Sequence, residues 1–423
     1  MAHTPHPCVS VPHRLGHNPL ATLPKRKETP VNTGLHGTSH FSVVVEGWRT
    51  GTHSYALVNQ AQLREMGGRS DIRVTHRDLT PPSEPDGTNT ARPDDRAVST
   101  PAHVAGDIAD VAYRIAAPFD LTASEHARRT VVFLTTEHHY MPDVLMADGK
   151  PFAEAYRSSA AHLVTPSNWS RDGLIASGAD PARVHVVPHG VDAEVFHPLD
   201  DPDRTSLRRE MGIPDETFVY LHVGAMTGNK GIQDILQAFA IVTQFVPSAH
   251  LILKGNDALY SSNDRIERFI DQFLTPTDRQ RIASRMSYFG QQLSATDIAS
   301  LYQASDAYVS PYRAEGFNMP VLEAVASGLP VIVTAGGPTD EFVPKGVGQF
   351  IRATLVGMPE GRGEHLSPDL GDLVEGMGRV ALDRSLGARA RVAGPAHVAA
   401  SHTWGHVTDK LVALLRDQAP RHQ

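Results

Sequence analysis

The sequence has almost no cysteine, since Cys8 is the only one among its 423 residues. A single thiol can form neither a disulfide within the chain nor a thiolate metal cluster, which indicates a reducing compartment. Long apolar runs are also missing: none approaches the roughly 20 residues of a membrane-spanning helix. Pro5, Pro7 and Pro12 interrupt the N-terminal segment, where a signal sequence would be apolar. We therefore expect a cytoplasmic protein without an integral membrane segment.

Positively charged residues are also fewer than negatively charged ones. Lysine and arginine number 39 against 47 aspartates and glutamates, which gives a formal net charge of −8. This balance argues against a nucleic-acid-binding protein that relies on a basic surface. The chain is 40% hydrophobic and 20% charged, as a soluble globular protein would be, and its length fits two domains of ordinary size. The composition does not predict an oligomeric state.

Histidine is plentiful, with 23 residues, and this raises the question of a metal site. The adjacent His138 and His139 would diverge on most backbones. Asp201-Pro202-Asp203 imitates an Asp-x-Asp metal motif, but its acidic, proline-containing surroundings favour a turn. Four further histidines lie in a proline-rich segment without periodicity: His3, His6, His13 and His17. We therefore expect no metal site and no cofactor.

The chain alternates between short apolar runs and helical stretches after residue 38. Residues 1–38 are rich in Pro, His, Thr and Gly and predict a flexible extension. Alternation of strands and helices is typical of mostly parallel sheets with helices on both faces. The expected strands are 41–46, 131–135, 162–165, 184–187, 218–223, 251–254, 287–289, 307–310 and 331–334, and the expected helices include 54–66, 231–245, 265–274, 319–327 and 404–416. We expect two doubly wound α/β domains, at residues 39–195 and 196–403.

The most informative segment is 312–324, with the sequence YRAEGFNMPVLEA. It follows an expected strand and opens a helix, with Pro320 in the first turn, where its missing N–H costs nothing. A helix N-terminus presents free N–H groups and partial positive charge, so residues Gly316, Phe317, Asn318 and Met319 could cradle phosphate oxygens. Glu323 lies one turn inside the helix, where it could accept hydrogen bonds from vicinal hydroxyls. Glu315 precedes the helix, at the mouth of this loop.

The two glutamates, spaced as Glu-x7-Glu within EGFNMPVLEAVASGLPVIVT, closely resemble the signature of the family 4 retaining glycosyltransferases. The resemblance implies the GT-B fold, in which two Rossmann-like domains face each other across a cleft and the last helix, at about 404–418, crosses back onto the first domain. It also implies roles for both carboxylates. Glu315 would contact the transferred sugar, and Glu323 would hold the ribose of the donor nucleotide.

Other loops after strands of the second domain converge on the same sheet edge, where ligands bind in open parallel sheets. Lys230, at a helix start, matches the family's phosphate-binding lysine, but Ala225 occupies the position of its usual arginine partner. Lys254, after the neighbouring strand, is the candidate replacement. The segment around Gly290, Gln291 and Leu293 matches the family's loop around the nucleotide base.

The first domain would hold the acceptor. Gly51 and Thr52 match the family's loop that approaches the donor diphosphate from across the cleft. Glu137 and His138 follow an expected strand and face the cleft, which makes them candidates for acceptor binding. As single residues, the histidines are better explained as satisfied structural groups.

The resemblance implies a metal-independent, retaining, hexosyl-type glycosyltransferase. It would move a sugar from a UDP- or GDP-linked donor to an acceptor nucleophile, expected to be a hydroxyl, with Glu315 and Lys230 as catalytic residues. Two alternatives stay open: a sugar-nucleotide epimerase or phosphorylase of the same fold, and a non-catalytic nucleotide-sugar-binding protein. The sequence identifies neither the base and sugar of the donor nor the acceptor.

Overall fold

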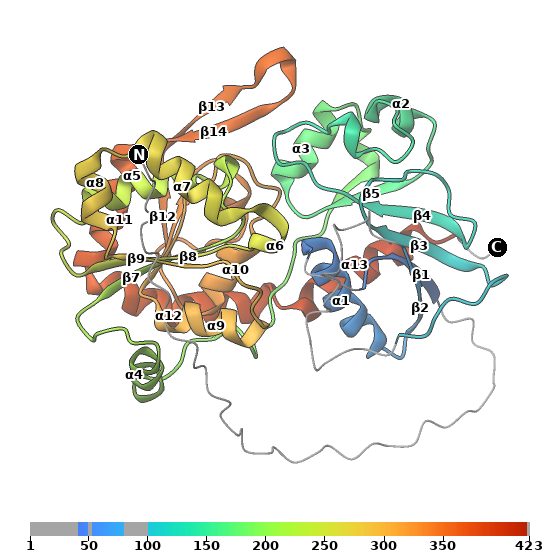
Figure 1. Cartoon of the computed structure of the whole chain (residues 1–423). Coiled ribbons are helices and arrows are strands. Elements are labelled where there is room, and N and C mark those ends of the chain that lie inside the picture. Colours follow the sequence, from blue (N-terminus) through green and yellow to red (C-terminus); the bar gives the residue numbers. More distant parts are fainter. Residues whose placement is uncertain (1–40, 50–52, 80–99, 421–423) are drawn as a thin grey trace. The chain divides into compact units, whose positions relative to one another are not determined.

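The structure is a computed structural model that describes residues 41–49, 53–79 and 100–420. The expected N-terminal extension lies outside these ranges. Residues Phe41–Gln423 form one compact unit that contains two parallel six-stranded sheets. The predicted α/β fold class, with two doubly wound parallel sheets, is therefore confirmed (Figure 1).

The first sheet has the order β2-β1-β3-β4-β5-β6, and all five pairings are parallel. Its central strands are apolar because helices cover both faces. Three strands match the sequence prediction closely, whereas β2 and β3 were missed because charged residues interrupt their alternation. The strands are β1 Phe41–Gly47, β2 Ile72–Asp78, β3 Ala109–Ile115, β4 Ala127–Phe133, β5 His162–Thr165 and β6 Val184–Val186.

The second sheet has the order β12-β11-β10-β7-β8-β9, again with parallel pairings. The order reverses at β7, and at such a point the loops after neighbouring strands separate and leave a crevice. The strands are β7 Phe218–Val223, β8 Ala249–Lys254, β9 Met286–Phe289, β10 Ala307–Ser310, β11 Val331–Thr334 and β12 Gly348–Ile351.

Thirteen α-helices flank the two sheets in the described part of the chain. Those of the first half are α1 Ser54–Gly67, α2 Phe152–Arg157 and α3 Asn168–Ala176. Those that follow are α4 Asp201–Glu210, α5 Ile232–Val242, α6 Asp257–Tyr260, α7 Ser262–Phe273, α8 Pro276–Ile282, α9 Ala295–Ala304, α10 Met319–Ala326, α11 Leu370–Leu382, α12 Arg384–Ser401 and α13 Trp404–Gln418.

A hairpin of β13 Ala353–Gly357 and β14 Glu364–Pro368 interrupts the βα alternation between β12 and α11. It is antiparallel and forms a separate two-stranded sheet that projects from the second half (Figure 1). The sequence analysis did not predict it, because its outer positions are exposed and it has no continuous apolar face.

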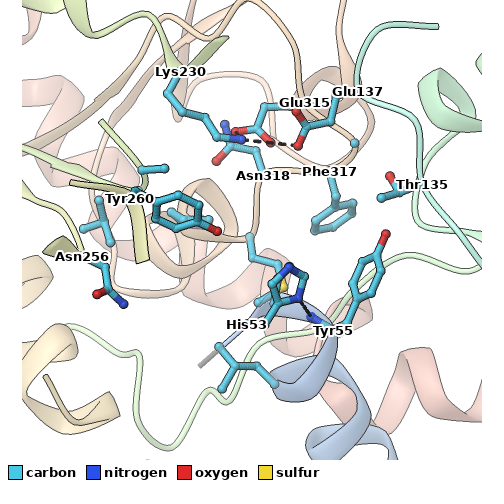
Figure 2. Close-up of a pocket in the computed structure, with 18 of the residues that line it drawn as sticks. His53, Tyr55, Thr135, Glu137, Lys230, Asn256, Tyr260, Glu315, Phe317 and Asn318 are labelled. Carbon is cyan, nitrogen blue, oxygen red and sulfur yellow. Dashed lines mark hydrogen bonds and ion pairs between the residues drawn. The ribbon is translucent and has the colours of Figure 1, made fainter. Parts of the chain in front are cut away.

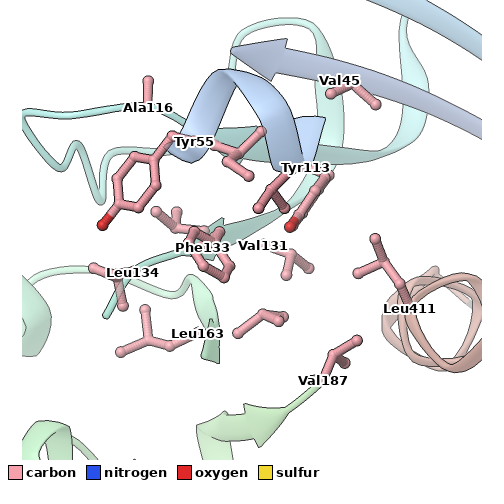
Figure 3. Packing of buried hydrophobic residues seen from close by; sticks show 14 of the residues in the cluster. Val45, Tyr55, Tyr113, Ala116, Val131, Phe133, Leu134, Leu163, Val187 and Leu411 are labelled. Carbon is pink, nitrogen blue, oxygen red and sulfur yellow. The ribbon is translucent and has the colours of Figure 1, made fainter. Parts of the chain in front are cut away.

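The last helix, α13, belongs to the core of the first half. Its residues Trp404, Val407 and Leu411 are buried in the cluster that includes Val131 and Phe133 (Figure 3). The chain therefore crosses between the halves twice. The two crossings contact each other, because the Val191 N–H donates to the carbonyl of His402 at 2.9 Å.

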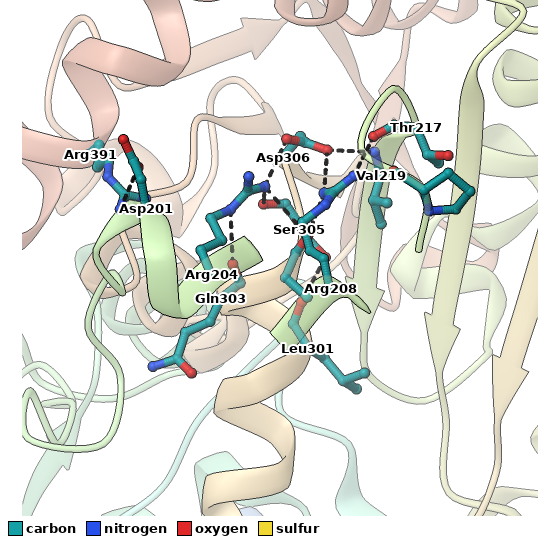
Figure 4. A network of polar contacts seen from close by, with 12 residues as sticks. Asp201, Arg204, Arg208, Thr217, Val219, Leu301, Gln303, Ser305, Asp306 and Arg391 are labelled. Atoms are coloured by element: carbon teal, nitrogen blue, oxygen red, sulfur yellow. Dashed lines mark hydrogen bonds and ion pairs between the residues drawn. The ribbon is translucent and has the colours of Figure 1, made fainter. Parts of the chain in front are cut away.

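The Asp201-Pro202-Asp203 segment is not a turn, so that this expectation was wrong. It forms the first turn of α4, because Asp200 caps the helix through the Asp203 N–H and the acidic residues complement the helix dipole. Arg204 and Arg208 of α4 both bind Asp306 next to β10, at 2.8 and 3.1 Å (Figure 4). These ion pairs anchor α4 against the second sheet.

Candidate functional site

The Glu315 loop joins β10 to α10 at the carboxyl edge of the second sheet. Asn318 caps α10 with a left-handed backbone (φ 77°), and its side chain donates to the Ser310 hydroxyl at 3.1 Å. Gly316 is required for close packing, because a Cβ there would lie 2.0 Å from Oγ1 of Thr135. The loop is also tied to the 3-10 turn Gly228–Lys230, since the Arg313 N–H donates to the Asn229 carbonyl at 2.7 Å.

Lys230 lies between two carboxylates from different halves of the molecule. Its Nζ is 2.8 Å from Oε1 of Glu315 and 3.7 Å from Oε1 of Glu137 (Figure 2). The other oxygen of Glu137 accepts from the Asn229 side-chain amide at 3.0 Å. Glu137, which sequence reasoning assigned to the acceptor, thus also contacts the candidate phosphate-binding turn.

Burial and charge oppose each other at this ion pair. Burial raises the pKa of Glu315 to about 6, although Lys230 pulls it down. Burial alone would lower the pKa of Lys230, but the carboxylates of Glu315 and Glu137 outweigh burial and raise it. Lys230 is therefore a permanent cation, and Glu315 is a carboxylate that titrates not far below neutral pH.

Glu323 lies one turn into α10 and lines the same pocket. Its Oε2 accepts from the Tyr302 hydroxyl at 2.9 Å, which fixes the carboxylate against α9. Phe317, which precedes the helix, stacks on Phe342 at 4.6 Å and contacts the His189 ring at 5.0 Å. The loop residues that the sequence singled out are therefore held rigidly and point to one pocket.

Lys254 and Ala225 both line the pocket on its second-half side. Lys254 is buried, and its Nζ donates to the Gly255 carbonyl oxygen. Asn256 and Tyr260, which sequence reasoning missed, also line this side (Figure 2). Their signal in the sequence was weak because both follow Lys254 in a loop and short helix without a motif.

The loop after β9 is brought to the pocket only in part. Leu293 and its neighbour Gln292 line the pocket, whereas Gly290 and Gln291 are not among its lining residues. Packing explains the glycine at position 290 instead, because a Cβ there would lie 1.7 Å from a carboxylate oxygen of Asp257. Gly51 and Thr52 lie outside the described residues.

On the first-half side, the loop after β4 carries Glu137 and His138 into the pocket. Burial lowers the pKa of His138, so that its ring is neutral near pH 7. His139 turns away from the pocket, with a left-handed backbone (φ 53°). Its ring packs tilted against Trp169 with the ring centroids 3.6 Å apart, and its Nδ1 lies 3.2 Å from Oε2 of Glu364. The adjacent histidines diverge, as the sequence predicted.

The hairpin links this loop to the Glu315 loop through strand β14. The Glu364 N–H donates to the His138 carbonyl at 2.8 Å, and the Leu366 N–H donates to the Arg313 carbonyl at 2.7 Å. Gly363 packs so tightly on His138 that a Cβ would lie 2.1 Å from its carbonyl oxygen. Strand β14 therefore ties the loop of Glu137 and His138 to the Glu315 loop.

The pocket has a volume of about 600 Å³ and is lined from both halves. This size suits a small-molecule ligand. Its second-half side brings together two lysines, two glutamates and a helix N-terminus, which is the arrangement expected for an anionic ligand with hydroxyl groups. Within the described ranges, no three His, Cys, Asp or Glu side chains gather as metal ligands do, and no helix is long and apolar enough to span a membrane.

Two parallel six-stranded α/β sheets with a pocket lined from both halves are the arrangement of the GT-B class. Sequence comparison is consistent with this class: the model of the Glycosyl transferases group 1 family matches residues 203–355, and that of Glycosyltransferase Family 4 matches residues 51–195. The chain belongs to the group 1, or family 4, glycosyltransferases.

Curated relatives include the D-inositol 3-phosphate glycosyltransferases of Mycobacterium bovis and Mycobacterium tuberculosis. They are 30% identical over 258 residues, which covers 60% of this chain and 48% of theirs. The matched part of the chain thus spans about half the length of these relatives.

Solved structures show the same fold at low identity. Anabaena Alr3699/HepE in complex with UDP-glucose matches with a TM-score of 0.65 and 16% identity, over 89% of this chain and 100% of that one. WaaG, a glycosyltransferase involved in lipopolysaccharide biosynthesis, matches with a TM-score of 0.59 and 14% identity, over 88% and 99%. Both likenesses establish the fold.

Proposed function

We propose that this protein is a retaining glycosyltransferase that moves a hexosyl group from a nucleotide diphosphate sugar to an acceptor hydroxyl. The observation that carries the proposal is the contact of Lys230 with Glu315 at 2.8 Å beside the N-terminus of α10. It places a fixed cation, free backbone N–H groups and a carboxylate around one point, which suits a diphosphate attached to a sugar.

In this proposal, each half has its own substrate. The second half, from about residue 196 to 403, binds the donor: Lys230, Lys254 and the α10 N-terminus hold the diphosphate, and Glu323 holds the ribose. The first half, from about 39 to 195 with α13 added, binds the acceptor. Family membership supports this division, and so does the lining of the pocket from both halves.

The reaction needs no protein nucleophile. The bond between the anomeric carbon and the phosphate oxygen breaks, the acceptor oxygen bonds to the same face of that carbon, and the acceptor proton passes to the departing phosphate. Lys230 and the loop amides stabilise the charge that develops on the phosphate, where one fixed donor contributes roughly 3 kcal/mol. Glu315 orients the sugar. No cofactor or metal enters this scheme.

A donor panel tests the proposal. The full chain is titrated calorimetrically with UDP-, GDP- and ADP-linked glucose, and release of free nucleoside diphosphate is then measured with mixed acceptors. The Anabaena complex with UDP-glucose supports a UDP-linked donor, so that UDP-glucose is expected to bind most tightly. An isomerised nucleotide sugar without acceptor would indicate an epimerase instead. Tight donor binding without any turnover would indicate a non-catalytic binding protein, consistent with Ala225.

A further inference from the structure

The first-half wall of the pocket is divided by polarity. Several of its polar side chains lie near Glu315 and Lys230: Thr135 and Thr136 follow β4, and Glu137 reaches to within 3.7 Å of Lys230. Two further polar residues, His53 and Ser54, line the wall at the start of α1. Away from this point the wall is mainly apolar and aromatic, with Tyr55, Leu57, Ala117, Phe119, Pro142 and Leu145. Polar groups therefore surround the reacting centre, and apolar groups surround the space that leads to it.

The apolar wall continues onto the surface. Leu145 lines the pocket and is 37% exposed, and its neighbour Val144 is 87% exposed. Both belong to the 3-10 turn Asp143–Leu145, which packs at the pocket rim. An exposed Val–Leu pair that continues an apolar pocket wall favours contact with an apolar ligand over contact with water.

In its described residues the same wall has no permanent positive charge, although His53 and Ser54 line it at the N-terminus of α1. Among the described first-half residues that line the pocket there is no lysine or arginine. Burial lowers the pKa of His138, and burial lowers that of His189 to about 3, so that both rings are neutral near pH 7. Arg49 is held outside the pocket by Asp78. Glu137 adds negative charge, which would repel a phosphorylated acceptor.

We propose that the acceptor is an uncharged alcohol that carries an apolar or aromatic group beside the part that bears its hydroxyl. The hydroxyl lies among Thr135, Thr136 and Glu137, and the apolar or aromatic group packs along Phe119 and Leu145. This inference rests on the proposed function, because it assigns the first-half wall to the acceptor. It separates this chain from its mycobacterial relatives, which are named for a phosphorylated inositol.

A binding experiment on the UDP-loaded protein tests this without requiring turnover. Calorimetry compares 4-nitrophenyl β-D-glucoside, which is uncharged with an apolar group, with glucose and with D-inositol 3-phosphate. We expect the nitrophenyl glucoside to bind at least tenfold more tightly than either. Equal or tighter binding of D-inositol 3-phosphate overturns the proposal, and so does equal binding of glucose.

A pair of lysine substitutions locates the contact. Leu145→Lys places a cation at the rim and should weaken binding of the nitrophenyl glucoside at least fivefold while it strengthens that of D-inositol 3-phosphate. Val104→Lys is the control, because Val104 is 62% exposed in the same half and does not line the pocket. UDP affinity should stay unchanged in both. If both variants bind the nitrophenyl glucoside like the parent, the acceptor does not use this wall.

The outcomes distinguish this inference from the proposed function. Transfer to D-inositol 3-phosphate but not to the nitrophenyl glucoside leaves a glycosyltransferase with a different acceptor class. Selective binding of the nitrophenyl glucoside without release of nucleoside diphosphate would support the assignment of the first-half wall to the acceptor and would contradict the proposed catalytic function.

Discussion

At the scale of single residues, Glu315 combines two properties that are usually separate. It forms an ion pair with Lys230 at 2.8 Å, and it still has a raised pKa because burial disfavours its charge. A carboxylate with a pKa of about 6 is charged at neutral pH and protonated in mild acid. Protonation removes the acceptor that Lys230 and the donor sugar would share.

The first prediction concerns pH. Because the pKa of Glu315 is raised to about 6, kcat/KM should be constant above pH 7 and fall about tenfold per unit below pH 6. The measurement is a pH profile of nucleoside diphosphate release. In Glu315→Gln the rate should be low throughout and this limb should disappear. A limb that persists in Glu315→Gln would assign it to another group.

The second prediction concerns Lys230. Replacement by methionine keeps the apolar stem and removes the charge that faces the leaving phosphate, so that kcat should fall by roughly 10²- to 10³-fold. UDP should also bind at least tenfold more weakly by calorimetry. Lys345→Met is the matched control, since Lys345 is exposed on the same half. An equal effect of the two substitutions would show that Lys230 acts only through overall charge.

Local patterns reveal residues that share one segment more readily than residues that meet through the fold. Glu315, Glu323 and the α10 start lie within nine residues, and their positions could be predicted from turn and helix signals. The contact of Glu137 with Lys230 joins positions 137 and 230, and only the packing of two sheets brings them together. Gln291 was favoured over Gln292 because a loop has no periodicity to decide which side chain points inward.

At the scale of elements, the hairpin of β13 and β14 is the least expected feature. Most of the parallel strands could be predicted from apolar runs, and several helices from helical spacing, whereas β2, β3 and β12 were missed. The hairpin is exposed on its outer face, and its function in the fold depends on two backbone hydrogen bonds, to His138 and Arg313. Backbone contacts leave little trace in side-chain patterns.

The third prediction tests the hairpin. Gly363 has φ +96° and contacts His138, so that Gly363→Ala should displace the loop that carries Glu137 and lower kcat at least tenfold. Gly361→Ala is the control, because Gly361 also has positive φ (+67°) but has open space around it. UDP affinity should change less than twofold in both. Equal loss of activity in the two variants would contradict a role for the His138 contact.

At the scale of the whole molecule, the C-terminal helix stabilises the half of the protein that is farthest from it in sequence. The packing of Leu411 with Val131 and Phe133 makes the first core dependent on the last residues of the chain. The sequence predicted a helix at 404–416, and the family resemblance supplied its return to the first half.

The fourth prediction follows from this packing. Leu411→Ala should lower the unfolding free energy by about 2–5 kcal/mol, because it removes a fully buried side chain. Calorimetry should show the loss as a lower unfolding temperature. Leu382→Ala is the control, because Leu382 is 69% exposed and its replacement should change stability by less than about 0.5 kcal/mol. Similar shifts for the two leucines would contradict the assignment of α13 to the first core.

The two chain crossings between the halves have a mechanical consequence. They run together, with Val191 hydrogen-bonded to His402 and Gly190 packed on the backbone of Trp404, where a Cβ would lie 2.7 Å from its nitrogen. Two chain segments joined in this way resist sliding and separation, but they can twist about the line along which they run together. Any opening that admits a donor would then be a rotation with essentially one axis, and a side chain at position 190 would clash with the Trp404 backbone and force the two segments apart at that axis.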